Sequence, residues 1–145
     1  MASNRSTSRK ALATLLEAGL VGDGLPVKTV SASKQTSLEG LSPLVTVLSA
    51  GSIRERMTFQ GDQSSFLLTV QAWVLQSGTD WTLAQAEDAL DDIESRIAAL
   101  YETNRGTDTW DVLEQVGQTT VVEVAVAGVP YYLEEIPSLV RLARN

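Results

Sequence analysis

The chain has 145 residues and a net charge of −7, and 43% of its residues are hydrophobic, which is enough for one folded domain with a single core. It contains neither cysteine nor histidine, so the sequence excludes disulfides, zinc–thiolate sites and catalysis by a histidine base. No apolar run is long enough to span a membrane, and we expect no enzymatic activity, no cofactor and no bound metal.

A polar tail opens the chain over residues 1–6, and we expect it to be flexible. Ser6 or Ser8 can cap a first helix that runs to about Ala18 and is ended by Gly19. The further glycines behind this helix lead into a strand. A dinucleotide-binding loop has the opposite order, strand before helix, so these glycines do not indicate one.

Strand patterns dominate the middle of the chain. Alternating or β-branched residues predict three strands, at Val27–Ser33, Leu44–Leu48 and Phe66–Leu75. The longest polar stretch, residues 51–65, lies between the last two, and we expect it to be a mobile loop or a hairpin with its turn near Gly61 and Asp62. Arg54 and Arg56 in this stretch are candidate residues for a subunit or partner interface; the alternative is a solvated loop.

The most regular pattern of the chain predicts a helix at Thr82–Thr103. Thr82 and Gln85 have the spacing of a capping box, and Gly106 can adopt the left-handed conformation that ends a helix. Six apolar residues recur every three or four positions and form one face, about 100° wide: Leu83, Ala86, Leu90, Ile93, Ile97 and Leu100.

Four carboxylates fall on the other side of this helix: Glu87, Asp88, Asp91 and Asp92. They could form a solvated face, a surface that repels a polyanion, or a divalent metal site. No histidine is available to complete a metal site, and Asp92 stands four residues before Arg96, the favourable order for a surface ion pair. A solvated face is the commonest role of such residues.

Strand patterns return after Gly106. We expect strands at Thr109–Val116, Thr119–Ala127 and Val129–Glu134, with a break at Ile136–Pro137 and a short terminal helix or extended arm at Ser138–Arg144. The order of elements predicts an α+β fold, with one mainly antiparallel, twisted sheet and the two helices packed on one face. Residues 1–145 then form a single domain.

Charge is unevenly distributed along the chain. Residues 1–60 contain seven basic and four acidic residues, whereas residues 61–145 contain four basic and fourteen acidic residues. This asymmetry favours either a solvated acidic surface or contact between the basic end of one copy and the acidic end of another. The three tryptophans, Trp73, Trp81 and Trp110, suit core or subunit-interface packing better than ligand stacking. Trp73 lies on the second, half-apolar face of its strand and is a candidate interface residue.

The order of these segments resembles that of the tail terminator, or tail completion, proteins of long-tailed bacteriophages, which are minor tail proteins. The resemblance runs over nearly the whole chain, through five segments: KALATLLEAGL, SIRERMTFQG, SSFLLTVQAWVL, TLAQAEDALDDIESRIAALYE, and the strand pair TTVVEVAVAG and VPYYLEEI. It is a likeness of plan, because no single signature residue carries it.

The resemblance implies a structural virion protein without catalytic activity, assembled in the host cytoplasm. Members of that family form six-fold rings on the last ring of tail-tube protein, stop tube growth and present a surface to the head connector protein. DNA passes through the ring without specific binding. In such a homohexamer, Glu87, Asp88, Asp91 and Asp92 could form an acidic lumen that repels DNA phosphates.

Two alternatives stay open at this point. The first is another head–tail connector or neck protein, which would differ in the number of subunits and in whether it binds the tube or the portal. The second is a cellular α+β module that binds a small apolar ligand on the Trp73 side of the sheet.

Overall fold

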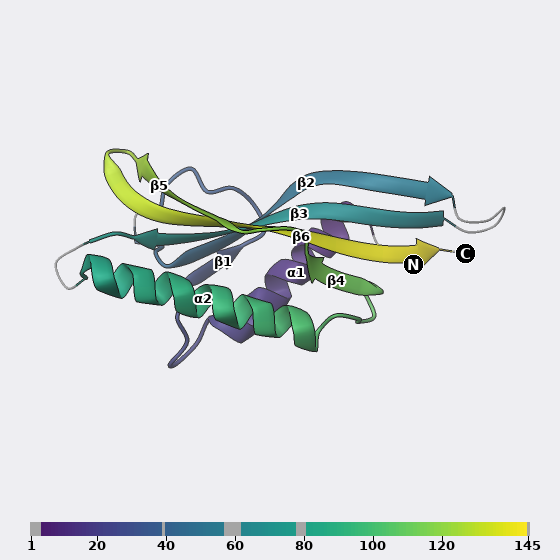
Figure 1. The fold of residues 1–145 in the computed structure, drawn as a ribbon, viewed down its shortest axis with the longest axis horizontal. Coiled ribbons are helices and arrows are strands. Elements are labelled where there is room, and N and C mark those ends of the chain that lie inside the picture. Colours follow the sequence, from purple (N-terminus) through teal and green to yellow (C-terminus); the bar gives the residue numbers. More distant parts are fainter. Residues whose placement is uncertain (1–3, 39, 57–61, 78–80, 145) are drawn as a thin grey trace.

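The computed structural model describes residues 4–38, 40–56, 62–77 and 81–144. Two helices and six strands follow one another within these residues, and the α+β class expected from the sequence is confirmed (Figure 1). In chain order they are α1 (Arg5–Leu20), β1 (Thr29–Ser31), β2 (Leu44–Arg56), β3 (Asp62–Leu75), α2 (Leu83–Thr103), β4 (Val112–Gln115), β5 (Thr120–Val126) and β6 (Val129–Arg144).

All six strands belong to one mixed sheet with the order β1-β2-β3-β6-β4. β1 pairs with β2 in parallel, and β2–β3, β3–β6 and β4–β6 are antiparallel pairs. β5 pairs antiparallel with residues 129–135 of β6, whereas β4 pairs with residues 138–141 of the same strand. Two short strands therefore lie one after the other along a single long partner, and β3 runs along its other side.

The largest correction to the sequence prediction concerns β6. We expected a strand to Glu134, a break at Ile136–Pro137 and a separate helix or arm, but one strand runs from Val129 to Arg144. The Pro137 carbonyl accepts from the Val116 N–H, so the backbone polar groups of Pro137 point to the side of β6 where β4 and β5 lie. Its missing N–H thus points to the gap between these two strands, and no bond to β3 is lost.

Residues 51–65 form one of the two expected structures. Arg56 pairs with Asp62 and Gly51 with Leu67, so β2 and β3 extend through this stretch as a hairpin, the second of the two expected alternatives. Of the two residues at which the turn was expected, Gly61 lies outside the described part of the chain, and Asp62 already belongs to β3. The pairing register shifts once, between Ser49 and Gly51, which marks a β-bulge. β2, β3 and β6 project beyond the end of α2, along the long axis of the molecule (Figure 1).

The helix boundaries were predicted with unequal success. Asn4 caps α1 by accepting from the Thr7 N–H, so the caps expected at Ser6 or Ser8 were wrong, and residues 5 and 6 belong to the helix rather than to the expected tail. The helix continues one residue past Gly19 to Leu20. The short strands β1, β4 and β5 all lie within their expected ranges but are shorter.

The capping box of α2 is confirmed. Gln85 N–H donates to Thr82 Oγ1 at 3.2 Å, and Thr82 N–H donates to Gln85 Oε1 at 2.8 Å. The predicted end of this helix was wrong in one respect, because Asn104 is the C-cap. The side-chain amide and the backbone N–H of Asn104 both donate to the Leu100 carbonyl, so Gly106 does not need a left-handed conformation.

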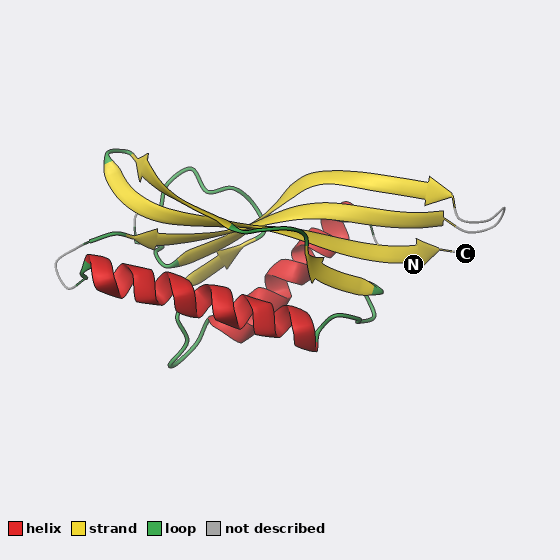
Figure 2. Cartoon of the chain, viewed as in Figure 1, coloured by secondary structure: helices red, strands yellow, loops and turns green. Residues whose placement is uncertain are grey.

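The main core is one cluster of buried side chains from both helices and from the sheet, and the two helices cross in Figure 2. Leu12, Leu16 and Leu20 of α1 are fully buried, and alternate residues of β3 from Leu68 to Val74 belong to the same cluster as the apolar face of α2. Trp110 is buried in this core, and its indole N–H donates to the Asn104 carbonyl. The intervening residues of β3 therefore point to the opposite face of the sheet.

Candidate functional site

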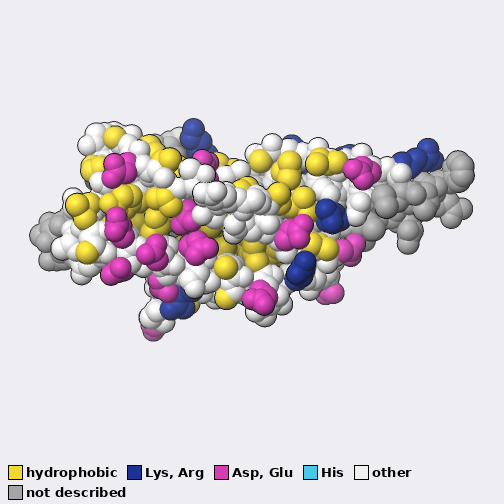
Figure 3. Space-filling model, viewed as in Figure 1, with side chains coloured by type: hydrophobic (Ala, Val, Ile, Leu, Met, Phe, Trp, Pro, Cys, Tyr) yellow, Lys and Arg dark blue, Asp and Glu magenta, His cyan; other side chains and the backbone are white. Residues whose placement is uncertain are grey.

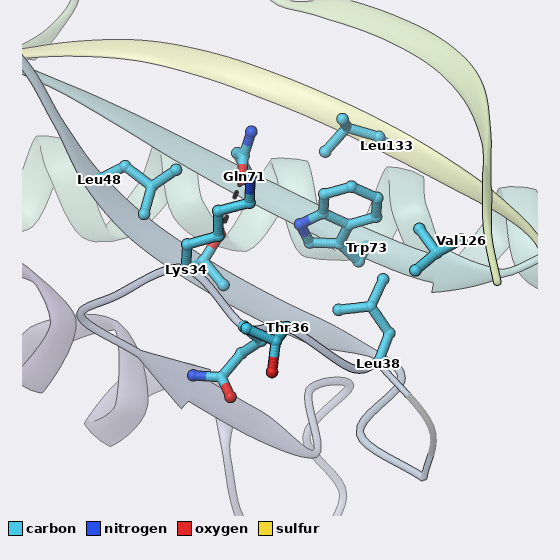
Figure 4. A pocket seen from close by; sticks show the side chains of 10 residues that line it. Lys34, Thr36, Leu38, Leu48, Gln71, Trp73, Val126 and Leu133 are labelled. Carbon is cyan, nitrogen blue, oxygen red and sulfur yellow. Dashed lines mark hydrogen bonds between the residues drawn. The ribbon is translucent and has the colours of Figure 1, made fainter.

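Trp73 lies on the face of the sheet opposite the main core. It borders a cavity of about 560 Å³ between the sheet and the chain segment 34–38 (Figure 4). Ten residues line this cavity, which we call the Trp73 cavity: Lys34, Gln35, Thr36, Leu38, Thr46, Leu48, Gln71, Trp73, Val126 and Leu133. The sequence placed Trp73 on the correct face of its strand, but it gave no sign that residues 34–38 fold over that face.

The apolar end of the Trp73 cavity is formed by side chains that pack on one another. Leu38 is buried against Leu44 and Tyr131 in a second, smaller core, and Trp73 packs on this cluster. The rings of Trp73 and Tyr131 meet edge to face, with centroids 6.3 Å apart and planes at 83°. The indole is therefore held in place by neighbours in β6 and in the covering segment.

A polar chain of hydrogen bonds crosses the floor of the other end. Thr46 Oγ1 donates to Gln71 Oε1 at 3.1 Å, and Gln71 Nε2 donates to Glu135 Oε2 at 3.1 Å. The Gln71 amide thus uses both of its ends within the sheet. Lys34 lies at this end of the cavity, is exposed, and forms no ion pair with the residues that the structure describes.

Arg54 lies on the projecting hairpin and is exposed. Its guanidinium stands over the Phe66 ring, 5.6 Å from the centroid. It also borders a hollow of about 340 Å³ together with Arg5 and Arg9 of α1, and these three arginines form what we call the arginine cluster. Arg56 is exposed as well, at the end of β2.

The sequence did not predict that Arg5 and Arg9 join Arg54, because more than 40 residues separate them in the chain. Two hydrogen bonds tie α1 to β2 here: Arg5 donates to Ser52 Oγ at 3.2 Å, and Arg9 donates to Ser49 Oγ at 3.1 Å. No carboxylate within the described ranges forms an ion pair with any of the three. The cluster is therefore a concentrated positive charge on an acidic protein.

The four carboxylates of α2 that the sequence singled out are all exposed: Glu87, Asp88, Asp91 and Asp92. The expected pair of Asp92 with Arg96 is confirmed, with Nε 3.1 Å from both carboxylate oxygens. Glu87 accepts a long hydrogen bond of 3.5 Å from the Tyr132 hydroxyl. Burial, followed by the charges of Glu87 and Glu123, raises the pKa of Tyr132.

A buried carboxylate lies next to this acidic face of α2. Glu134 on β6 is only 5% exposed, and its burial raises the pKa of the carboxyl. The charges of Glu94 and Asp91 raise it further, whereas a hydrogen bond with Thr119 lowers it. Successive residues of a strand point to opposite faces, so Glu135, the next residue, bonds to Gln71 on the other face.

The candidate residues therefore occupy three separate surfaces. Trp73 belongs to the cavity, Arg54 and Arg56 to the projecting hairpin, and the carboxylates to the outer side of α2. Within the part of the chain that the structure describes, no group of three acidic side chains is arranged to hold a metal ion.

Both lateral edges of the sheet are open along part of their length. β1 pairs with β2 only up to Thr46, and beyond that residue no described strand pairs with the edge of β2 that faces away from β3. β5 pairs with β6 alone. Apolar side chains are exposed on both strands, with Ile53 47% exposed on β2 and Val121 53% exposed on β5. Open strand edges with apolar side chains are common sites of strand-to-strand association.

No protein-family model matches this chain, and no curated protein matches it in sequence. None of the helices within the described ranges is long and apolar enough to cross a membrane.

Proposed function

We propose that this chain is a structural virion protein that caps the tail tube of a long-tailed bacteriophage as a homo-oligomeric ring, most simply a hexamer. The ring stops tube growth and forms the joining surface to the head connector. The observation that carries the proposal is the pair of open sheet edges, β2 beyond Thr46 and β5. One chain thus offers two different edges for two different neighbours.

Two different edges on one chain favour a head-to-tail interface. Such an interface is heterologous, and it closes into a ring when the rotation between neighbours permits. In the proposed contact, the edge of β2 around Ile53 in one copy lies against the edge of β5 around Val121 in the next. Main-chain hydrogen bonds would supply affinity, and the exposed apolar side chains would become buried in the interface.

The charge distribution supports the same arrangement. The arginine cluster and Arg56 lie where the hairpin projects. Acidic side chains gather over the other half of the visible face, where β5 and the first half of α2 lie (Figure 3). Glu123 of β5 contributes to this acidic half. A basic end and an acidic end attract each other in a head-to-tail contact and repel in a head-to-head one.

The acidic side of α2 suits the lumen of such a ring. Glu87, Asp88, Asp91 and Asp92 are exposed, as residues that face a channel must be. Negative side chains repel DNA phosphates, so genome DNA would pass through without specific binding. In this proposal the sheet is mainly antiparallel and twisted, and both helices pack on one of its faces. The opposite face, with Trp73, would then face the tail tube or the head connector.

The proposed partners are further copies of this chain, the tail-tube protein and the head connector protein, and the proposed place is the virion tail, after assembly in the host cytoplasm. The protein acts by shape and contact, so the proposal assigns it no catalytic group and no cofactor. Purified tail-tube protein provides a direct test. Adding the chain should shorten the tubes and leave it bound at one end, whereas binding to the portal alone would favour another neck protein.

A lysine placed on β5 tests the proposed interface between neighbouring copies. Val121→Lys should lower the fraction of ring, because it places an ammonium where an apolar strand edge is proposed to pair. Leu83→Lys is a matched control, since Leu83 is also 53% exposed but lies at the start of α2, outside both edges. Rings that form equally well from Val121→Lys would exclude β5 from the interface.

A further inference from the structure

The Trp73 cavity has the properties of a small-molecule site. Its volume of about 560 Å³ falls in the range of roughly 300–1,000 Å³ in which ligand pockets are found. Its walls are mostly apolar, formed by Leu38, Leu48, Trp73, Val126 and Leu133. Trp73 contacts Tyr131, and Leu38 belongs to one buried cluster with Leu44, so two of these walls pack against the rest of the protein.

The polar groups of the cavity are gathered at one end. On the floor, Gln71 is already bonded to Thr46 and Glu135, so it offers little to a ligand. The covering segment supplies the remaining polar side chains, and Lys34 is the one cation among the residues that line the cavity. Figure 4 shows Lys34 at the Gln71 end and Trp73 among Leu38, Val126 and Leu133 at the other.

We propose that the Trp73 cavity binds a small anionic amphiphile, a molecule with an aliphatic or flat apolar body and one carboxylate or sulfonate group. The apolar body lies against Trp73 and Leu133, where it is removed from water. The anionic group lies at the mouth next to the ammonium of Lys34, which has no ion pair among the described residues to give up. This site is independent of ring formation and requires only a folded chain.

Decanoate below its micellar concentration is a suitable probe, and decanol is its neutral counterpart of equal chain length. We expect saturable binding of one decanoate per chain by calorimetry, with a change in tryptophan fluorescence that is lost in Trp73→Phe. Lys34→Gln should weaken decanoate binding about two- to fivefold, the effect of one exposed ion pair, and leave decanol binding unchanged. Lys28→Gln is the matched control, since Lys28 is exposed and lies outside the cavity.

A second variant tests the place of binding. Thr36 is exposed at the cavity wall, so Thr36→Trp fills the space without disturbing a buried residue, and it should abolish binding of both probes. Unchanged binding by Thr36→Trp would overturn the site. Equal losses of decanoate and decanol affinity in Lys34→Gln, or losses of the same size in Lys28→Gln, would overturn the role of Lys34.

Discussion

The hydroxyl of Tyr101 on α2 lies 2.6 Å from Ser138 Oγ on β6, and both residues are buried. Ser138 Oγ also donates to the Ile136 carbonyl at 3.2 Å, so the tyrosine is the donor in the shorter bond. Burial raises the pKa of Tyr101 far above its ordinary value, although the bond with Ser138 opposes this. The phenol therefore stays protonated and joins the long helix to the central strand.

The direction of this bond predicts unequal effects of removing its two ends. Ser138→Ala leaves the Tyr101 hydroxyl buried without an acceptor and should lower the free energy of unfolding by about 1–3 kcal/mol. Tyr101→Phe should cost less, about 1 kcal/mol, because Ser138 keeps its bond to Ile136. Urea unfolding measures both. The double variant should cost less than the sum of the two, and strictly additive costs would show that the hydroxyls do not interact.

Sequence-based reasoning succeeded where the signals are local. The capping box and the apolar face of α2 act within one helix, so Thr82, Gln85 and the spacing of six apolar residues sufficed to place it. β6 depends instead on partners far away in the chain. Pro137 was expected to break the strand, and only the gap between β5 and β4 explains why it does not.

The candidate site was predicted only in part for the same reason. Trp73 was assigned to the correct face, because strands alternate with a period of two. The cover over it was not predicted, since Leu38 is a single apolar residue in a polar segment. The arginine cluster was also missed, because Arg5 and Arg54 meet only after α1 packs on β2.

The capping box makes a prediction about α2. Thr82→Ala should lower the free energy of unfolding by about 1 kcal/mol, because it leaves the Gln85 N–H at the helix start without its acceptor. Thr82→Ser retains a hydroxyl at the same position and should restore nearly all of that loss. Thermal unfolding compares the three proteins. A Thr82→Ser protein as unstable as Thr82→Ala would mean that the methyl group, not the hydrogen bond, matters.

The close approach of the two helices makes a prediction about Gly19. A Cβ at this residue would lie 2.6 Å from Leu100 Cδ1, so Gly19→Ala should cost about 1–3 kcal/mol through overpacking. Leu100→Ala should relieve the clash. In that background, Gly19→Ala should be neutral or stabilising, because alanine favours a helix over glycine by about 1 kcal/mol. Chemical unfolding of the single and double variants measures this reversal, and equal costs in both backgrounds would contradict it.

Glu134 makes the stability depend on pH. Its folded pKa is raised, so the folded protein holds this proton more tightly than the unfolded chain does. The cost of ionising it is absent below the ordinary value of 4.5 and is fully present above the folded pKa. Glu134→Gln should therefore raise the Tm at pH 7, by a few degrees for a gain of about 1 kcal/mol, and lose this advantage at low pH.

Glu135→Gln is the matched control for that measurement. It removes one charge from the neighbouring residue on the opposite face, where the side chain accepts from Gln71. Thermal unfolding between pH 4 and pH 8 distinguishes the two variants, because these limits lie on either side of the ordinary glutamate pKa of 4.5. An advantage of Glu134→Gln that persists unchanged at the acidic end would show that ionisation is not its cause.

The ring proposal is tested by the mass of the protein in solution, measured by light scattering over a concentration series, with negative-stain images of any large species. We predict a species of about six copies with a central channel wide enough for duplex DNA, because two complementary open edges favour closure. Val121→Lys should shift the population toward single chains. A compact dimer without a channel at every concentration would contradict the proposal.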